Sequence, residues 1–117
     1  MASHPRTHLT PEQYLEIERT AEHKSEYYNG EMFAMSAGTL THSRLTRNLI
    51  VALERQLRAC PSEPVGSDMR VHIPVTGLYT YPDVSVFCGT PVFLGDSRDT
   101  LLNPTLIAEV LSPSTDA

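Results

Sequence analysis

Two carboxylates in the second half of the chain have the residue type and the sequence context to do chemistry. Asp83 follows Pro82 and precedes the β-branched, apolar run of a buried strand. Glu109 interrupts the apolar segment LIAEVLS, where burying an unpaired carboxylate is costly or forces its protonation. We therefore predict that Glu109 is buried with a partner, and that the two acids meet at the edge of one sheet if their strands are neighbours.

A pair of converging carboxylates is suited to holding a divalent cation. Two such groups repel each other unless a cation or a shared proton lies between them. Mg²⁺ and Mn²⁺ commonly take one or two carboxylates and complete their shells with water and substrate phosphate. The structural alternative is that Asp83 only bonds backbone amides in a turn, while Glu109 is a hydrogen-bonded buried acid. The residues alone leave both interpretations open.

Four other polar residues are weaker candidates for the same site. His42, near the start of the strongest helical pattern, is either a helix-terminus residue or a neighbour of the metal or phosphate. Asp68 either faces solvent or adds a ligand. Glu26 and Glu31 flank a hairpin turn and are surface acids unless they reach the site. Each of these residues keeps a structural alternative beside the functional one.

The elements in the first half of the chain follow from short-range signals. Thr10 and Gln13 have the spacing of a capping box at a helix start. Asn29-Gly30 lies between runs rich in aromatic residues and methionine, which predicts a β-hairpin. Leucines and alanine at spacings of three and four predict the principal helix over 41–60.

Three strands are predicted in the second half of the chain. The segment 65–77 alternates apolar residues with polar ones such as Arg70, which indicates a strand with one side toward solvent. The strands over 81–89 and 105–112 carry the two acids. The order of helix, hairpin, helix and three strands indicates a mixed α+β fold.

Composition limits the class of protein. A chain of 117 residues, 40% hydrophobic and 20% charged, indicates one folded domain over 10–117 after a flexible N-terminal arm at 1–9. No window is apolar enough for a membrane helix or a secretory signal, so we expect a cytoplasmic protein with no membrane partner. The two cysteines make no disulfide framework, and the five scattered histidines give little support to a structural zinc site.

The charge balance bears on nucleic-acid binding. A net charge of −5 is unfavourable for a module that grips long stretches of phosphate backbone. It argues less strongly against a nuclease, because a metal site gathers acids and a local basic strip can still hold the substrate. Such a strip is offered by Arg44, Arg47, Arg55 and Arg58 in the principal helix, which either meet DNA or are merely solvated.

Four segments taken together carry a family resemblance. In order, SEYYNGEMFAMS, THSRLTRNLIVAL, YPDVSVF and PTLIAEVLSPST resemble the Uma-two-type family of restriction endonucleases in the PD-(D/E)XK nuclease superfamily. The resemblance implies a restriction-endonuclease-like core, with a mixed β-sheet, an N-terminal hairpin and a principal packed helix. It also implies that Asp83 and Glu109 bind Mg²⁺ or Mn²⁺ and that His42 lies beside them. A metal-activated water would then attack phosphorus in DNA.

The chain also departs from the family pattern. The superfamily has a lysine two residues after the second acid, where this chain has Leu111. In the family the lysine usually follows in a later helix, so we expect this chain to lack it, together with the C-terminal strand and helix. The only lysine is Lys24, a poor substitute at the foot of the first helix. An uncovered strand edge favours either a homodimer or a fragment of a longer reading frame. The alternative function is a catalytically inactive, truncated nuclease-like domain that acts as an interaction or regulatory module.

Overall fold

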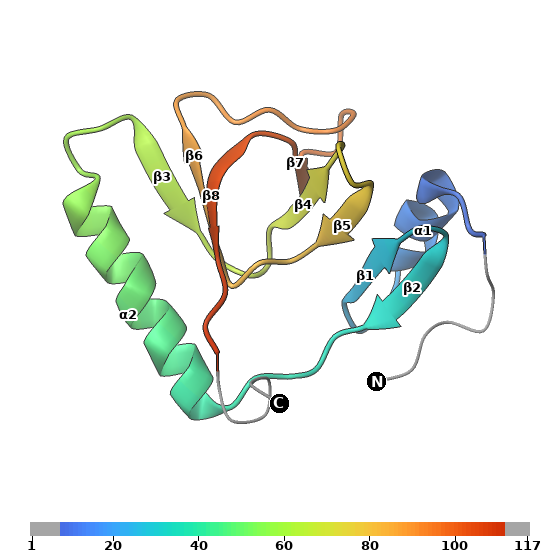
Figure 1. Cartoon of the computed structure of the whole chain (residues 1–117), viewed down its shortest axis with the longest axis horizontal. Helices are drawn as coiled ribbons and strands as arrows, with labels where there is room; N and C mark the ends of the chain where they lie inside the picture. The colour runs from blue at the N-terminus through green and yellow to red at the C-terminus, as the bar shows by residue number, and fades with distance from the viewer. Residues whose placement is uncertain (1–7, 112–117) are drawn as a thin grey trace. The chain divides into compact units, whose positions relative to one another are not determined.

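The computed structural model describes residues 8–111, so most of the predicted arm at 1–9 lies outside the described residues (Figure 1). The chain divides into two compact units. The first unit combines the segment up to Ala37 with His72–Thr80, and the second combines Gly38–Val71 with the segment from Tyr81. A single domain over 10–117 stays a prediction. Among the described residues, no helix has the length and apolar content needed to cross a membrane.

The first unit begins with α1, Pro11–Glu18, which starts at the predicted capping box. The Thr10 hydroxyl accepts a hydrogen bond from the Gln13 backbone N–H at 3.1 Å. The Gln13 side chain accepts one from the Thr10 backbone N–H at 2.8 Å. These bonds satisfy N–H groups that have no partner within the helix, so they fix where α1 begins.

A β-hairpin follows α1, as the Asn29-Gly30 pair predicts. β1, Ser25–Tyr28, pairs antiparallel with β2, Glu31–Ala34. Asn29 and Gly30 have φ angles of 50° and 87°, the left-handed pair that a type I′ turn requires. The short strand β5, Leu78–Thr80, pairs with β1 on its other edge.

Three tyrosines form the centre of the first unit. Tyr14 of α1, Tyr27 of β1 and Tyr79 of β5 have ring centroids 5.0 to 5.8 Å apart. All three are buried, and Tyr14 is completely so. Aromatic rings at these separations attract each other beyond the effect of the area that they bury. The helix and the hairpin of this unit are therefore held together by their own core.

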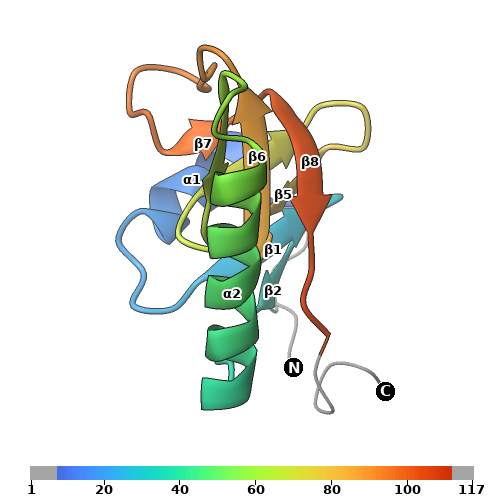
Figure 2. The same cartoon turned by 90° about the vertical axis from the view of Figure 1, so that its left-hand side faces the viewer.

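The second unit contains α2, Leu40–Gln56, and a three-stranded antiparallel sheet in the order β3-β6-β8. These strands are Ser62–Val65, Val84–Cys88 and Pro104–Ala108. Figures 1 and 2 show α2 running along this sheet. In β6, residues Val84 to Phe87 are buried, whereas α2 has no fully buried residue. The central strand is therefore well covered and the helix is only partly packed.

A parallel strand pair completes the set of elements. β7, Thr100–Leu101, pairs with the beginning of β4, Arg70–Ile73, whose remainder belongs to the first unit. Helices with both parallel and antiparallel strands make the predicted α+β class, and that prediction is confirmed. The sequence did not predict β3, β5 or β7. The strands β5 and β7, of three and two residues, are too short to show a period.

Arg70 is the first correction to the sequence prediction. The alternating pattern places it on a solvent-facing side, but it is only 5% exposed. Its guanidinium donates to the Thr100 hydroxyl and to the Tyr81 hydroxyl, each at 2.9 Å, and lies 2.9 Å from a carboxylate oxygen of Asp99. A buried arginine is tolerated because two hydroxyl groups accept hydrogen bonds from its guanidinium and Asp99 balances its charge. Such partners, distant in sequence, leave no periodic signal.

Glu109 is the second correction. The sequence predicts a buried acid inside a strand, but β8 ends at Ala108 and Glu109 is exposed. Leu106 and Ile107 of β8 are also 48% and 37% exposed. The apolar run therefore reflects an edge strand with little cover rather than a buried one. The argument that burial forces a partner on Glu109 is consequently wrong.

Candidate active site

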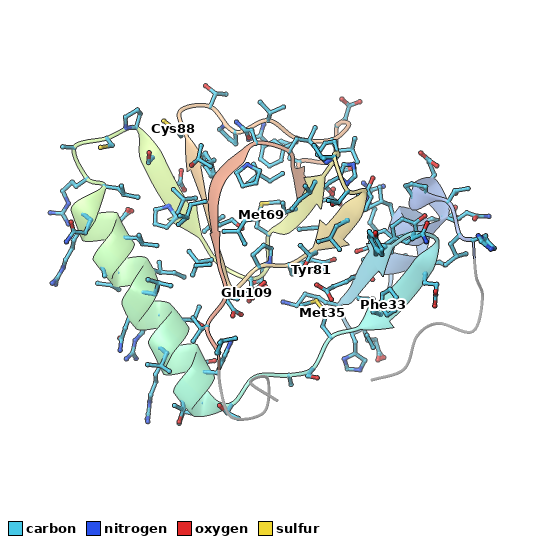
Figure 3. All side chains as sticks on the ribbon, viewed as in Figure 1. Phe33, Met35, Met69, Tyr81, Cys88 and Glu109 are labelled. Atoms are coloured by element: carbon cyan, nitrogen blue, oxygen red, sulfur yellow. The ribbon has the colours of Figure 1, made fainter. Side chains whose placement is uncertain are left out.

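Asp83 and Glu109 are adjacent because the strands that carry them are neighbours. β6 and β8 pair antiparallel, with Val84 opposite Ala108, so the residue before β6 meets the residue after β8. The Asp83 backbone N–H lies 3.4 Å from Oε1 of Glu109. Figure 3 shows Glu109 just beyond the end of β8. Strand register thus brings the Glu109 side chain to the backbone of Asp83.

His42 contacts Asp83 from the first turn of α2. The Thr39 hydroxyl caps α2 by accepting a hydrogen bond from the His42 backbone N–H at 3.1 Å. Nε2 of His42 lies 3.1 Å from Oδ2 of Asp83, and the two side chains are 18% and 16% exposed. An Nε2–H group donates a hydrogen bond to the carboxylate at this distance. Gly38 leaves room for the ring, since a Cβ there would lie 3.0 Å from Nδ1 of His42.

The two oxygens of Asp83 have different surroundings. Oδ2 receives the backbone N–H of Val110 at 2.7 Å as well as the contact with His42. Within residues 8–111, Oδ1 makes no hydrogen bond. A carboxylate held by two donors on one oxygen keeps a fixed orientation, which leaves the other oxygen available to a ligand.

The donor set fits a hard divalent cation that takes few of its ligands from protein. Two carboxylates from neighbouring strands match the one or two that Mg²⁺ usually takes from protein. Within the described part of the chain, no group of three or more His, Cys, Asp or Glu side chains has the arrangement of a metal site. A cation here would consequently need water and substrate oxygens to complete its shell, as is usual for Mg²⁺.

Arg70 helps to fix the segment that leads into Asp83. Tyr81, whose hydroxyl accepts from Arg70, lies two residues before Asp83 and is 6% exposed. Pro82 between them is also fully buried. The chain entering β6 is therefore fixed by packing and by the Arg70 hydrogen bond. The sequence analysis missed this role of Arg70. It also missed Thr39, which it could have found because its spacing of three residues from His42 is a capping signal.

The structure places the remaining candidates in other elements. Asp68 is exposed in the turn before β4. Glu26 and Glu31 belong to the hairpin of the first unit, where Glu26 accepts a hydrogen bond of 2.5 Å from the Thr80 hydroxyl. Lys24 also belongs to the first unit. The catalytic roles of Asp83, Glu109 and His42 stay predictions, although the contacts of Asp83 with His42 and with Glu109 are features of the structure.

Comparison with known proteins gives a consistent result. The Uma2 family model, described as "Putative restriction endonuclease", matches residues 11–117. Two curated proteins of Synechocystis sp., the uncharacterized proteins sll1609 and slr1290, are 41% identical over 106 residues and 38% identical over 120 residues. These matches cover 91% and 98% of this chain, but the chain spans only 60% of the length of each relative.

A solved structure shares the fold. The crystal structure of a protein from Anabaena variabilis, described as a "putative nuclease", matches with a TM-score of 0.68 at 19% identity. The match covers 94% of this chain and 60% of that chain. The predicted restriction-endonuclease-like core is thereby confirmed at the level of the fold.

Proposed function

Since the chain belongs to the Uma2 family, described as "Putative restriction endonuclease", we propose that it is a divalent-metal-dependent endonuclease that hydrolyses phosphodiester bonds in DNA. The observation that carries this proposal is that Asp83 contacts both His42 of α2 and Glu109 at the end of β8. Asp83 and Glu109 would bind Mg²⁺ or Mn²⁺, and His42 would position Asp83. Restriction-endonuclease-like proteins as a class support the use of a divalent cation.

The side chains of the site have separate tasks in this proposal. A bound Mg²⁺ or Mn²⁺ would activate a water and neutralise the charge that develops on the phosphate. Oδ1 of Asp83 would be the oxygen that binds the cation, because Oδ2 is held by His42 and by the Val110 N–H. Glu109 is exposed and can therefore meet both the cation and a large substrate from solvent. In this proposal the side chains bind and orient the metal ion, and the metal ion would supply the positive charge that stabilises the phosphate.

The departure from the family pattern supports a second candidate function. Leu111 stands where the superfamily has a lysine, and Lys24 is the only lysine. A chain with these carboxylates but without a catalytic lysine would bind the metal ion without cleaving DNA. The second candidate is thus a catalytically inactive nuclease-like domain that acts as an interaction or regulatory module.

Calorimetric titration with Mn²⁺ tests the site. The parent chain, Asp83→Ala and Glu109→Ala are compared with Glu63→Ala, a control that removes an exposed acid from β3 of the same unit. Circular dichroism verifies that all four are folded. We expect saturable binding by the parent and the control, and none by the two site variants. Absence of binding by the folded parent would exclude the proposed metal site.

A cleavage assay separates the two candidate functions. Supercoiled plasmid is incubated with the parent chain in Mn²⁺, in Mg²⁺ and in EDTA. Nicking that needs the cation and disappears in Asp83→Ala supports the endonuclease. Metal binding with no nicking at any protein concentration supports the inactive module.

We also propose that the chain forms a homodimer through β8. Within the described residues no strand pairs with the outer edge of β8, and its Leu106 side chain is 48% exposed. An edge with free backbone groups and apolar side chains is a template for pairing. Sedimentation velocity tests this proposal with Leu106→Lys, which we expect to be monomeric. Val75→Lys, at a site 95% exposed in the first unit, is the control and should not change the dimer.

A further inference from the structure

Four arginines gather on the side of α2 that faces away from the sheet. Arg44, Arg47 and Arg55 lie in α2, and Arg58 lies in the turn that follows it. Their spacings of three, eight and three residues return to one side of a helix with 3.6 residues per turn. All four are exposed. We call this set the arginine stripe.

The opposite side of α2 is the one that packs. His42, Thr46, Leu49 and Leu53 recur at spacings of three and four, and each is partly buried. His42 contacts Asp83 of β6 from this side. Figure 2 shows no other element of the second unit in front of α2. The arginine stripe is therefore on an uncovered surface of its own unit.

The arginine stripe is not neutralised by its own surroundings. None of its four side chains makes an ion pair within residues 8–111, and the only hydrogen bonds are those of Arg47 to Asn48. Glu54 is the single acid between Leu40 and Arg58. Solvated helix faces usually mix charges of both signs at spacings of three and four. Here like charges stand three residues apart, at 44 and 47 and again at 55 and 58, and Glu54, four residues before Arg58, is the one acid on this side.

The local charge is opposite to that of the whole chain. The chain has a net charge of −5 and nine lysines and arginines in total, four of which make up the arginine stripe. Like charges placed together repel, so the arrangement is unfavourable for the isolated protein. A polyanion lying along the helix removes that repulsion. The concentration of cations on one helix of an acidic chain thus indicates a binding surface.

We propose that the arginine stripe binds the phosphate backbone of duplex DNA. From Arg44 to Arg58 the stripe extends about 21 Å, at 1.5 Å per helical residue. Duplex DNA carries one negative charge per roughly 1.7 Å of its axis, so several phosphates lie within reach of four guanidinium groups. This inference rests on the proposed function, from which DNA is taken as the polyanion.

The position of the arginine stripe defines what it contributes. It lies on the side of α2 opposite His42, so it does not touch the phosphate that would react beside Asp83 and Glu109. Contacts to phosphate hold a duplex and fix its orientation without reading its sequence. The stripe therefore contributes affinity and salt dependence, and it leaves cation binding at the carboxylates unchanged.

The test measures how DNA affinity depends on salt. A fluorescently labelled duplex of about 20 base pairs is titrated with the chain in EDTA, between about 50 and 200 mM NaCl, and binding is followed by anisotropy. Four phosphate contacts give a slope of log K against log[NaCl] of about −3.6, at about −0.9 per contact. Affinity then falls by about 150-fold over this range of salt.

Two double variants each remove half of the arginine stripe. Arg44→Gln with Arg47→Gln, and Arg55→Gln with Arg58→Gln, should each reduce the magnitude of the slope by about 1.8. Glutamine keeps a high helix propensity, so α2 is retained. The control is Arg19→Gln with Arg98→Gln, which changes the net charge equally at residues outside α2. It should leave the slope unchanged.

Several outcomes would overturn the inference. An equal loss in the control double variant means that overall charge and not the stripe is responsible. Failure to bind the duplex would contradict the proposal. Tighter binding to vesicles containing phosphatidylserine than to the duplex would also contradict it. Mn²⁺ titration of the same variants distinguishes the two proposals. If the double variants change the salt dependence of DNA binding but the chain does not bind Mn²⁺, only the metal site is excluded. If the chain binds Mn²⁺ but the double variants leave the salt dependence unchanged, only DNA binding by the arginine stripe is excluded.

Discussion

The backbone N–H of Val110 donates a hydrogen bond of 2.7 Å to Oδ2 of Asp83. This bond joins the residue before β6 to a residue after β8, 27 positions apart along the chain. Because the donor is backbone, the bond does not depend on the side chain at position 110. It orients the Asp83 carboxylate and holds Glu109, the preceding residue, beside it. The site is thus built from strand register more than from side-chain packing.

Asp83→Asn separates the charge of Asp83 from its shape. The amide keeps an oxygen that can accept the Val110 N–H, so we expect folding to be retained within about 1 kcal/mol of unfolding free energy. Loss of an anionic ligand should weaken Mn²⁺ binding by more than about tenfold. Calorimetry and urea unfolding of one preparation measure both quantities. Unchanged Mn²⁺ affinity in a folded Asp83→Asn chain contradicts the assignment of Asp83 as a ligand.

His42→Gln tests whether the histidine positions Asp83. Residues that hold a ligand in place typically contribute about 10- to 100-fold to metal affinity. We expect a loss in this range for Mn²⁺, because Nε2 of His42 holds Oδ2 of Asp83. His23→Gln, an exposed histidine of the first unit, is the matched control and should bind Mn²⁺ as the parent does. Equal affinities for the parent and both variants would leave His42 as a helix-terminus residue only.

Local signals predicted the parts of the fold that are set by a few neighbouring residues. Thr10 and Gln13 gave the start of α1, and Asn29-Gly30 gave the hairpin, because caps and tight turns are determined within four residues. The convergence of Asp83 and Glu109 was predicted only on the condition that their strands are neighbours. Register, which decides that condition, depends on the whole sheet.

Burial was the property that the sequence predicted least well. Arg70 alternates with apolar residues as a solvent-facing residue would. It is nevertheless buried, because it donates hydrogen bonds to Thr100 and Tyr81 and forms an ion pair with Asp99. Glu109 follows an apolar run as a buried residue would, yet its strand lies at an edge. Both errors have one physical cause, since the residues that cover or pair with a side chain lie far away in sequence.

Gly38→Ala should separate the stability of the chain from the geometry of its site. An added Cβ would lie 3.0 Å from Nδ1 of His42, so the ring must move by a few tenths of an ångström. We expect Mn²⁺ affinity to fall several-fold through the displaced contact with Asp83. The loss of backbone freedom in the unfolded chain raises stability by up to about 1 kcal/mol. Calorimetry and urea unfolding measure the two effects, which have opposite signs.

Gly66→Ala is the control for the change at Gly38. Its Cβ would meet only Cδ1 of Ile50 at 3.7 Å, an ordinary contact. It should raise stability by a similar amount and leave Mn²⁺ binding unchanged. A fall in Mn²⁺ affinity in both variants, or in neither, removes the link between Gly38 and the orientation of His42.

Gly30→Ala tests the close approach of chain segments in the first unit. Gly30 has a φ of 87°, and a Cβ on it would lie 2.8 Å from the backbone Cα of His8. Gly77 has a φ of 79° with nothing within 4 Å of the added Cβ, so it carries the same backbone strain without a clash. We expect Gly77→Ala to lower the free energy of unfolding by about 1 kcal/mol. Gly30→Ala should cost clearly more, because a backbone segment must shift and the hydrogen bond from the Leu9 N–H to the Gly30 carbonyl is disturbed. Urea unfolding followed by tyrosine fluorescence measures the difference. Equal losses of stability in the two variants would show that left-handed strain alone makes glycine necessary at position 30, without a contribution from packing against His8.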